Sequence, residues 1–209
     1  MGMDWKSWLE WIACIVFLAG YVPIIKNTIH GPLRPPKVSW LVFFLNDTVS
    51  GICQYMGPHH AVTGQLIGAT LGAAAVCIVT LKYGKKGWSR ADIITLIGAG
   101  IAMGAAIIYR NSWLGVLLSQ AASWCGCGKL FQHAIAHSEE ESRTAWFLFW
   151  VSVFPQTGAL LLGEITAEEV IQIVSFFIGN TIMVYLLFFY PRGVQRKKIN
   201  FPGSISGMK

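Results

Sequence analysis

The chain has 209 residues, of which 54% are hydrophobic and 12% are charged, and its formal net charge is +6. So few charged residues cannot cover the water-exposed surface of a soluble protein of this length. The composition therefore excludes an ordinary soluble domain and predicts a protein embedded in a lipid bilayer.

Seven apolar segments are each long enough to cross about 30 Å of hydrocarbon. In chain order they cover residues 8–27, 38–57, 61–81, 91–109, 112–134, 144–163 and 167–190. Lipid offers no partners to backbone polar groups, and the segments lack the period-2 alternation of barrel strands, so each is predicted to be a helix. We therefore predict an all-α membrane protein with seven transmembrane helices in one domain, residues 1–209.

The basic residues predict how the chain is oriented. If all seven segments cross, two of the sixteen lysines and arginines, Lys6 and Arg110, lie on the side of the N-terminus and fourteen on the other side. Short loops rich in lysine and arginine stay cytoplasmic, which places the N-terminus outside and the basic tail, residues 192–209, in the cytoplasm of a cell whose cytoplasmic (inner) membrane holds the protein. Because these charges are spread over loops without a basic groove, no nucleic-acid partner is expected.

The chain also aligns with itself at an offset of 106 residues. Residues 24–44 match residues 130–150 without a gap, and Gly20 meets Gly126, Trp40 meets Trp146 and Phe43 meets Phe149. The alignment predicts two parallel three-helix repeats, residues 8–82 and 112–191, joined by a linker helix over residues 91–109. The linker restores the direction of the chain, since a three-helix unit ends on the side opposite its start.

This 3+1+3 arrangement, the proline late in the first segment ("GYVPIIKN") and the charged loop leading into "SWLVFF" resemble the SWEET and PQ-loop superfamily of membrane transporters. The resemblance covers nearly the whole chain and implies alternating access, with hinges at Pro23 and Pro155. The superfamily's Pro-Gln pair is replaced by Pro23-Ile24 in the first repeat and by Lys129-Leu130 in the second. Asn180 resembles the asparagine that lines the pocket of sugar-carrying SWEETs, but its counterpart in the third segment is Ala74, which argues against a hexose.

Asp47 is the most informative residue, because it falls near the bilayer midplane. An ionised carboxylate facing lipid there costs a few kcal/mol, so Asp47 should face the interior and belong to a functional site or, alternatively, make a structural hydrogen bond. Asn46, Ser50 and Gln54 share its flank of the helix. No lysine or arginine lies at the depth of Asp47 in any segment to pair with it, so burial disfavours the charged form and permits coupling to protons.

Polar and aromatic residues at comparable depth complete a predicted binding site between the repeats. Its members are Asn46, Asp47, Ser50, Gln120, Trp150, Ser152 and Asn180. Trp124 is an open choice between site and packing, whereas Trp40 and Trp146, near helix ends, are expected in the membrane interface or in packing. The glycines at 64, 68 and 72, and those at 100 and 104, are expected to let helices approach closely.

We therefore predict a transporter of a small polar metabolite, such as a sugar, nucleoside or amino acid. The alternative is a non-transporting receptor or an accessory subunit of a membrane complex, with a homo-oligomer or another membrane protein as partner. No catalytic motif is present, so an enzyme is not expected. No cofactor is expected either, and His133 and His137 stand one turn apart without a third ligand for a metal.

Overall fold

The computed structural model describes residues 4–31, 33–57, 62–84, 90–109 and 111–190. These residues form the helices α1 (Trp5–His30), α2 (Lys37–Tyr55), α3 (Gly64–Tyr83), α4 (Arg90–Tyr109), α5 (Ser112–Ala136), α6 (Arg143–Leu161) and α7 (Ala167–Phe188), and the 3₁₀ helix η1 (Ser138–Glu140). The described residues contain no strand, so the all-helical prediction is confirmed. The basic tail, residues 192–209, lies outside the described residues.

Side-chain caps explain where several helices begin. Asp4 accepts a hydrogen bond from the Ser7 N–H at 2.8 Å before α1, and this bond lowers the pKa of the Asp4 carboxyl. Asn111, Ser142 and Thr166 cap α5, α6 and α7 in the same way. Each cap satisfies an N–H of the first turn that has no partner within its helix.

Length and composition make α1, α3, α6 and α7 apolar enough to cross a membrane. The helices α2 and α5 carry more buried polar side chains, among them Asp47, Gln54 and Gln120. These polar groups lower the hydropathy of both helices while pointing into the bundle.

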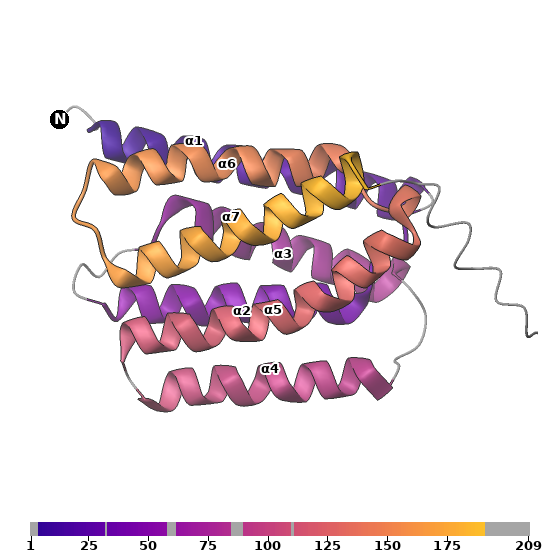
Figure 1. Cartoon of the computed structure of the whole chain (residues 1–209), viewed down its shortest axis with the longest axis horizontal. Helices are drawn as coiled ribbons and strands as arrows, with labels where there is room; N and C mark the ends of the chain where they lie inside the picture. The colour runs from indigo at the N-terminus through magenta and orange to yellow at the C-terminus, as the bar shows by residue number, and fades with distance from the viewer. Residues whose placement is uncertain (1–3, 32, 58–61, 85–89, 110, 191–209) are drawn as a thin grey trace, which may run out of the picture.

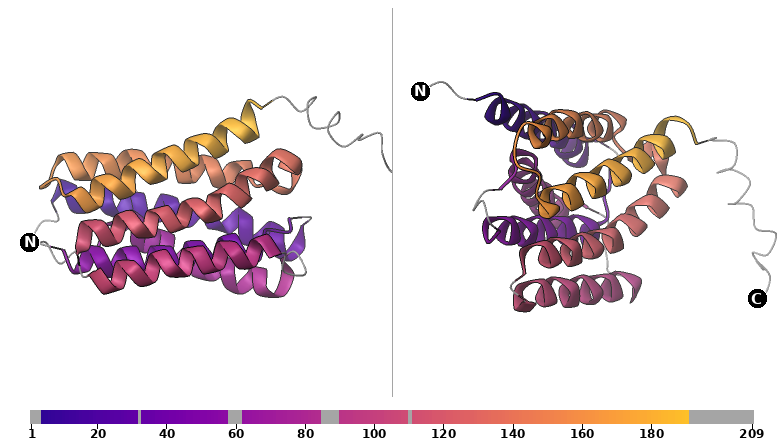
Figure 2. Two further views of the ribbon diagram at one scale, coloured as in Figure 1. Left: turned by 60° about the horizontal axis from the view of Figure 1, so that its bottom comes forward. Right: turned by 60° about the vertical axis from the view of Figure 1, so that its left-hand side comes forward.

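The helices pack in an order that differs from their order in the chain. α3 packs against both α1 and α2, and α7 packs against both α5 and α6. The two groups meet where α1 packs on α6 and α2 packs on α5 (Figure 1). α4 lies at the edge of the bundle against α5 and α2, as all views agree (Figure 2).

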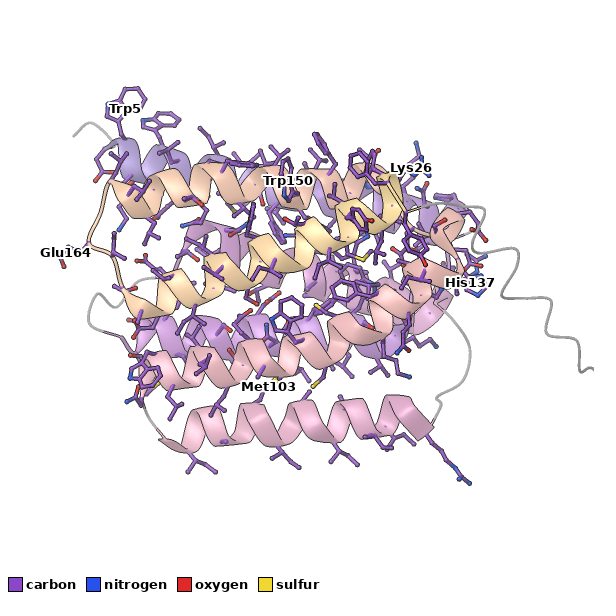
Figure 3. The ribbon with its side chains drawn as sticks, viewed as in Figure 1. Trp5, Lys26, Met103, His137, Trp150 and Glu164 are labelled. Carbon is purple, nitrogen blue, oxygen red and sulfur yellow. The ribbon has the colours of Figure 1, made fainter. Side chains whose placement is uncertain are left out.

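Successive helices run in opposite directions along the long axis of the bundle, so α1, α3, α5 and α7 all begin at the same end (Figure 1). At this end the described charged residues are Asp4, Glu10, Glu164, Glu168 and Glu169 with Lys6. We call it the acidic end, and we call the opposite end, which holds Lys26, Arg34, Lys37 and Arg143, the basic end. Trp5 and Glu164 mark the first and Lys26 and His137 the second in Figure 3.

Glycines in α3 let it approach α1 closely. A Cβ at Gly68 would lie 2.8 Å from the backbone oxygen of Cys14, and one at Gly72 would overlap the ring of Tyr21. The expectation for these glycines is therefore confirmed. It is wrong for Gly100 and Gly104, where an added Cβ would meet no described atom within 4 Å apart from neighbouring atoms of α4 itself, because the packed face of α4 carries Ala99 and Met103 instead.

We expect Gly68→Ala to lower the free energy of unfolding by about 1–3 kcal/mol, since the added methyl group meets rigid backbone of α1. Thermal unfolding of the purified protein in detergent measures the effect. Gly100→Ala is the matched control, because its methyl group enters open space. Equal stability of the two variants would contradict the close approach of α1 and α3.

Candidate functional site

Asp47 lies in the middle of α2 with only 5% of its surface exposed. Its one hydrogen bond within the described part of the chain comes from Asn46, whose Nδ2 donates to Oδ1 at 3.1 Å. On one side Asp47 faces a cavity inside the bundle, and on the other it borders a groove between α2 and α3. The carboxyl group is thus held by one amide and keeps acceptor capacity for a ligand.

The cavity lies between helices of both groups, and the space open to the centres of water molecules is about 70 Å³. This space holds a few water molecules or a small ligand. Nine aromatic side chains line it: Phe17, Tyr21, Trp40, Phe43, Trp124, Phe131, Trp146, Phe149 and Phe176. The other lining residues are Asp47, Ser123, Cys127, Leu130, Ser175, Gly179, Asn180 and Met183. The walls are therefore mainly aromatic, and no lysine, arginine or histidine is among them.

The aromatic rings hold one another in place. Phe17 stacks on Phe149 with 4.7 Å between ring centroids and on Phe176 at 5.7 Å, and Tyr21 lies 4.8 Å from Phe149. The Tyr21 hydroxyl donates to the backbone oxygen of Ala69 at 3.1 Å. These contacts join α1, α3, α6 and α7 around the cavity and fix its shape.

A polar cluster at the basic end holds one cavity wall. The Trp146 indole N–H donates to Glu141 at 3.2 Å, and the other carboxylate oxygen of Glu141 lies 3.1 Å from His133 Nδ1. Glu140 lies 3.3 Å from His133 Nε2. Glu141 thus fixes the orientation of the Trp146 ring, whose face forms part of the cavity.

Between the cavity and the acidic end, nine buried polar side chains cross the bundle. We call them the polar layer: Ser50, Gln54, Thr63, Gln65, Ser119, Gln120, Ser152, Gln156 and Gln172. On α2, α5, α6 and α7 the layer residues lie toward the acidic end and the cavity residues toward the basic end. The layer therefore separates the cavity from the acidic end.

Hydrogen bonds in the polar layer join helices from the two groups. Ser50 and Ser119 connect α2 to α5 with 2.6 Å between their hydroxyl oxygens, and Gln120 donates to Ser50 at 3.2 Å. Gln54 donates to Gln172 and so connects α2 to α7. The layer closes the cavity with bonds between elements that are far apart in the chain.

Two glutamines of the layer also complete the start of α3, where the Thr63 side chain makes no cap. Gln156 accepts from the backbone N–H of Gln65 at 3.1 Å, and Gln54 accepts from that of Thr63 at 3.2 Å. The Gln65 side chain donates in turn to Ser152 at 2.9 Å. The first turn of α3 is therefore capped by side chains from α2 and α6.

The structure separates the predicted site residues into three places. Asp47 and Asn180 line the cavity, and Asn46 binds Asp47. Ser50, Gln120 and Ser152 belong to the polar layer. Trp150 does not line the cavity: its indole N–H donates to Thr181 at 3.0 Å on the partly exposed seam of α6 and α7 (Figure 3).

The two predicted hinge prolines lie inside continuous helices, Pro23 in α1 and Pro155 in α6. Both are partly exposed. Each removes one backbone donor from its helix, which leaves a weaker point for bending. Their role as hinges stays a prediction.

The sequence did not assign the aromatic walls to the site. Trp40 and Trp146 were expected in the interface or in packing; both pack in the buried core, and both also line the cavity. The repeat alignment held a signal for them, because it pairs Trp40 with Trp146 and Phe43 with Phe149, and all four line the same cavity. Phe17 and Tyr21, one turn apart on α1, carried no comparable signal.

Within the described residues, no group of three or more histidine, cysteine, aspartate or glutamate side chains is arranged to hold a metal ion. Comparison with protein-family models, with curated proteins and with solved structures finds no match to the chain. The functional argument therefore depends on the cavity and the polar layer themselves.

We expect Gln156→Leu to lower the free energy of unfolding by about 1–3 kcal/mol, because it leaves the buried N–H of Gln65 without an acceptor. Gln156→Glu, which keeps an acceptor oxygen, should lose less. Thermal unfolding in detergent compares both with Thr157→Val, a control on the next residue, whose hydroxyl bonds only within α6. If Gln156→Leu were as stable as the control, the capping role would be refuted.

Proposed function

We propose that the protein is a seven-span membrane carrier that moves a small polar metabolite by alternating access, with two three-helix units joined by α4. In this proposal the acidic end faces outside and the basic end faces the cytoplasm, in agreement with the positive-inside rule. The architecture would be that of the SWEET and PQ-loop superfamily.

Reciprocal contacts support two related units. A Cβ at Gly20 would lie 2.5 Å from the Phe149 ring, and a Cβ at Gly126 would lie 3.2 Å from the Phe43 ring. Gly20 aligns with Gly126, and Phe43 aligns with Phe149, so the two contacts are copies of each other made in opposite directions. α3 between α1 and α2 likewise corresponds to α7 between α5 and α6.

One observation carries the proposal: a cavity with a buried acid lies between the units and is closed on one side by bonds that run between them. Secondary transporters place their sites at the interface of their repeats near the midplane. Closure by hydrogen bonds suits a gate, because each is worth only about 0.5–1.5 kcal/mol net and water can replace it. Gln65, Gln120 and Gln172 each retain one polar atom without a partner among the described residues, so entering water would find groups to bind.

During transport the cavity would then be open alternately at the acidic end and at the basic end. Opening the acidic end would separate Gln54 from Gln172 and Gln65 from Ser152, while the aromatic rings near the basic end close over the ligand. Rocking of the units about Pro23 and Pro155 would supply this motion. Asp47, which lies one turn from the polar layer, would bind the ligand or a proton and link its occupancy to the state of the layer.

The proposed orientation can be measured with introduced cysteines in a cysteine-free background. Glu164→Cys, in the exposed α6–α7 loop, should react with a membrane-impermeant maleimide in intact cells. Glu139→Cys, whose side chain is 71% exposed at the basic end, should react only after permeabilisation. The reverse pattern would overturn the orientation. Labelling of both residues in intact cells would mean that α6, the helix between them, does not cross the membrane.

Transport is tested with purified protein in liposomes and a panel of labelled sugars, nucleosides, amino acids and small amines. At least one class should equilibrate faster than in protein-free liposomes, and Asp47→Asn should slow that uptake by about tenfold or more, because the acid lies in the binding cavity. Thr48→Val is the control, since the Thr48 hydroxyl bonds to Phe44 of its own helix. Absence of uptake over the whole panel would favour the alternative, a receptor or an accessory subunit.

A further inference from the structure

We infer that the ligand of the cavity is an organic cation, an ammonium group with small alkyl substituents, for which Asp47 is the counter-ion and the aromatic rings are the walls. This inference names the substrate class of the proposed carrier and depends on the proposed function only for movement across the membrane. Binding itself can be measured without transport.

The first argument for a cation is that the cavity walls are mainly aromatic. Aromatic faces attract cations, and cages of aromatic rings bind quaternary ammonium groups. Here nine aromatic side chains and one carboxyl group line the same cavity, and no basic residue lines it to repel a cation. Trp40, Trp146 and Phe149 are each less than 7% exposed, so their contribution would act away from bulk water, where cation–π attraction is strongest.

The second argument is that few hydrogen-bonding groups line the cavity. The Tyr21 hydroxyl is occupied by Ala69, and the Trp124 indole N–H donates to Ser175 at 3.1 Å. Asp47, Asn180 and the hydroxyl groups of Ser123 and Ser175 keep hydrogen-bonding capacity among the described lining residues. A sugar would leave some of its many hydroxyl groups without partners there, each at a cost of about 1–3 kcal/mol. An alkylated ammonium group has few or no hydrogen bonds to lose.

The third argument is the excess of negative charge at the acidic end. Five carboxylates and one lysine are described there, around the ends of α1 and α7. A rim with one sign of charge raises the local concentration of ions of the opposite sign. Cations would therefore gather at the end that opens when the polar layer separates.

The decisive comparison uses choline and its uncharged carbon isostere, 3,3-dimethylbutan-1-ol, which have nearly the same shape. A ligand that binds only the folded protein raises the unfolding temperature according to its concentration and affinity. We expect choline to stabilise the purified full-length protein in detergent and the isostere to have at least about tenfold lower affinity, because only choline carries the charge.

Substitutions in the cavity and outside it test whether choline binds there. Trp124→Leu removes a cavity ring and should weaken choline binding by about tenfold, and Asp47→Asn should weaken it at least as much. Trp113→Leu is the matched control, because Trp113 lies in the first turn of α5 with 47% of its surface exposed and lines no part of the cavity. Retained unfolding cooperativity in each variant shows that the loss is not caused by misfolding.

The outcomes separate this inference from the carrier proposal. Equal binding of choline and the isostere, or no binding of choline by the folded wild-type protein, overturns the cation inference. Uptake of a neutral solute without binding of choline leaves the carrier and also overturns the cation inference. Binding of choline that depends on Asp47 and Trp124, without uptake in liposomes, supports the cation site and overturns the carrier.

Discussion

Polar groups buried among apolar helices must find their partners within the protein, and the arrangement of this chain follows from that constraint. Many of the buried polar side chains of α2, α5, α6 and α7 form one layer, where they bond to one another across the bundle. The same layer supplies the caps that α3 cannot make with its own side chain. Satisfying hydrogen bonds, capping a helix and closing the cavity are thus carried out by one set of residues.

The concentration of polar groups in the layer leaves the adjoining cavity mainly aromatic, with Asp47, Ser123, Ser175 and Asn180 as its polar side chains. Asp47 lies at the boundary between hydrogen-bonded and aromatic surroundings. A charged ligand could approach it from the aromatic side, while a change in the layer would alter its neighbours on the other side. In the proposed carrier, this boundary position would let one carboxyl group both bind the ligand and influence the gate.

The helices were largely predictable, because long apolar runs without period-2 alternation favour helices over strands. All seven predicted segments are helices, with ends within a few residues of the prediction. The site was predictable only in part, because hydropathy gives the depth of a residue but not the direction in which its helix turns it. Asp47 and Asn180 reach the cavity, whereas Trp150, at a suitable depth on α6, faces the seam with Thr181. Trp40 and Trp146 do pack in the core, as one of the two expectations had it, but closeness to a helix end did not reveal that both also line the cavity.

The reciprocal insertion of Phe149 beside Gly20 and of Phe43 beside Gly126 bears on the origin of the chain. A homodimer of a single three-helix protein would make both contacts with one glycine and one phenylalanine, since each subunit would supply the ring for the other. Gene duplication and fusion through α4 would then require no new packing interaction. After fusion the sequences of the two halves could diverge, so that position 47 kept an acid, Asp47, while the aligned position 153 became the apolar Val153.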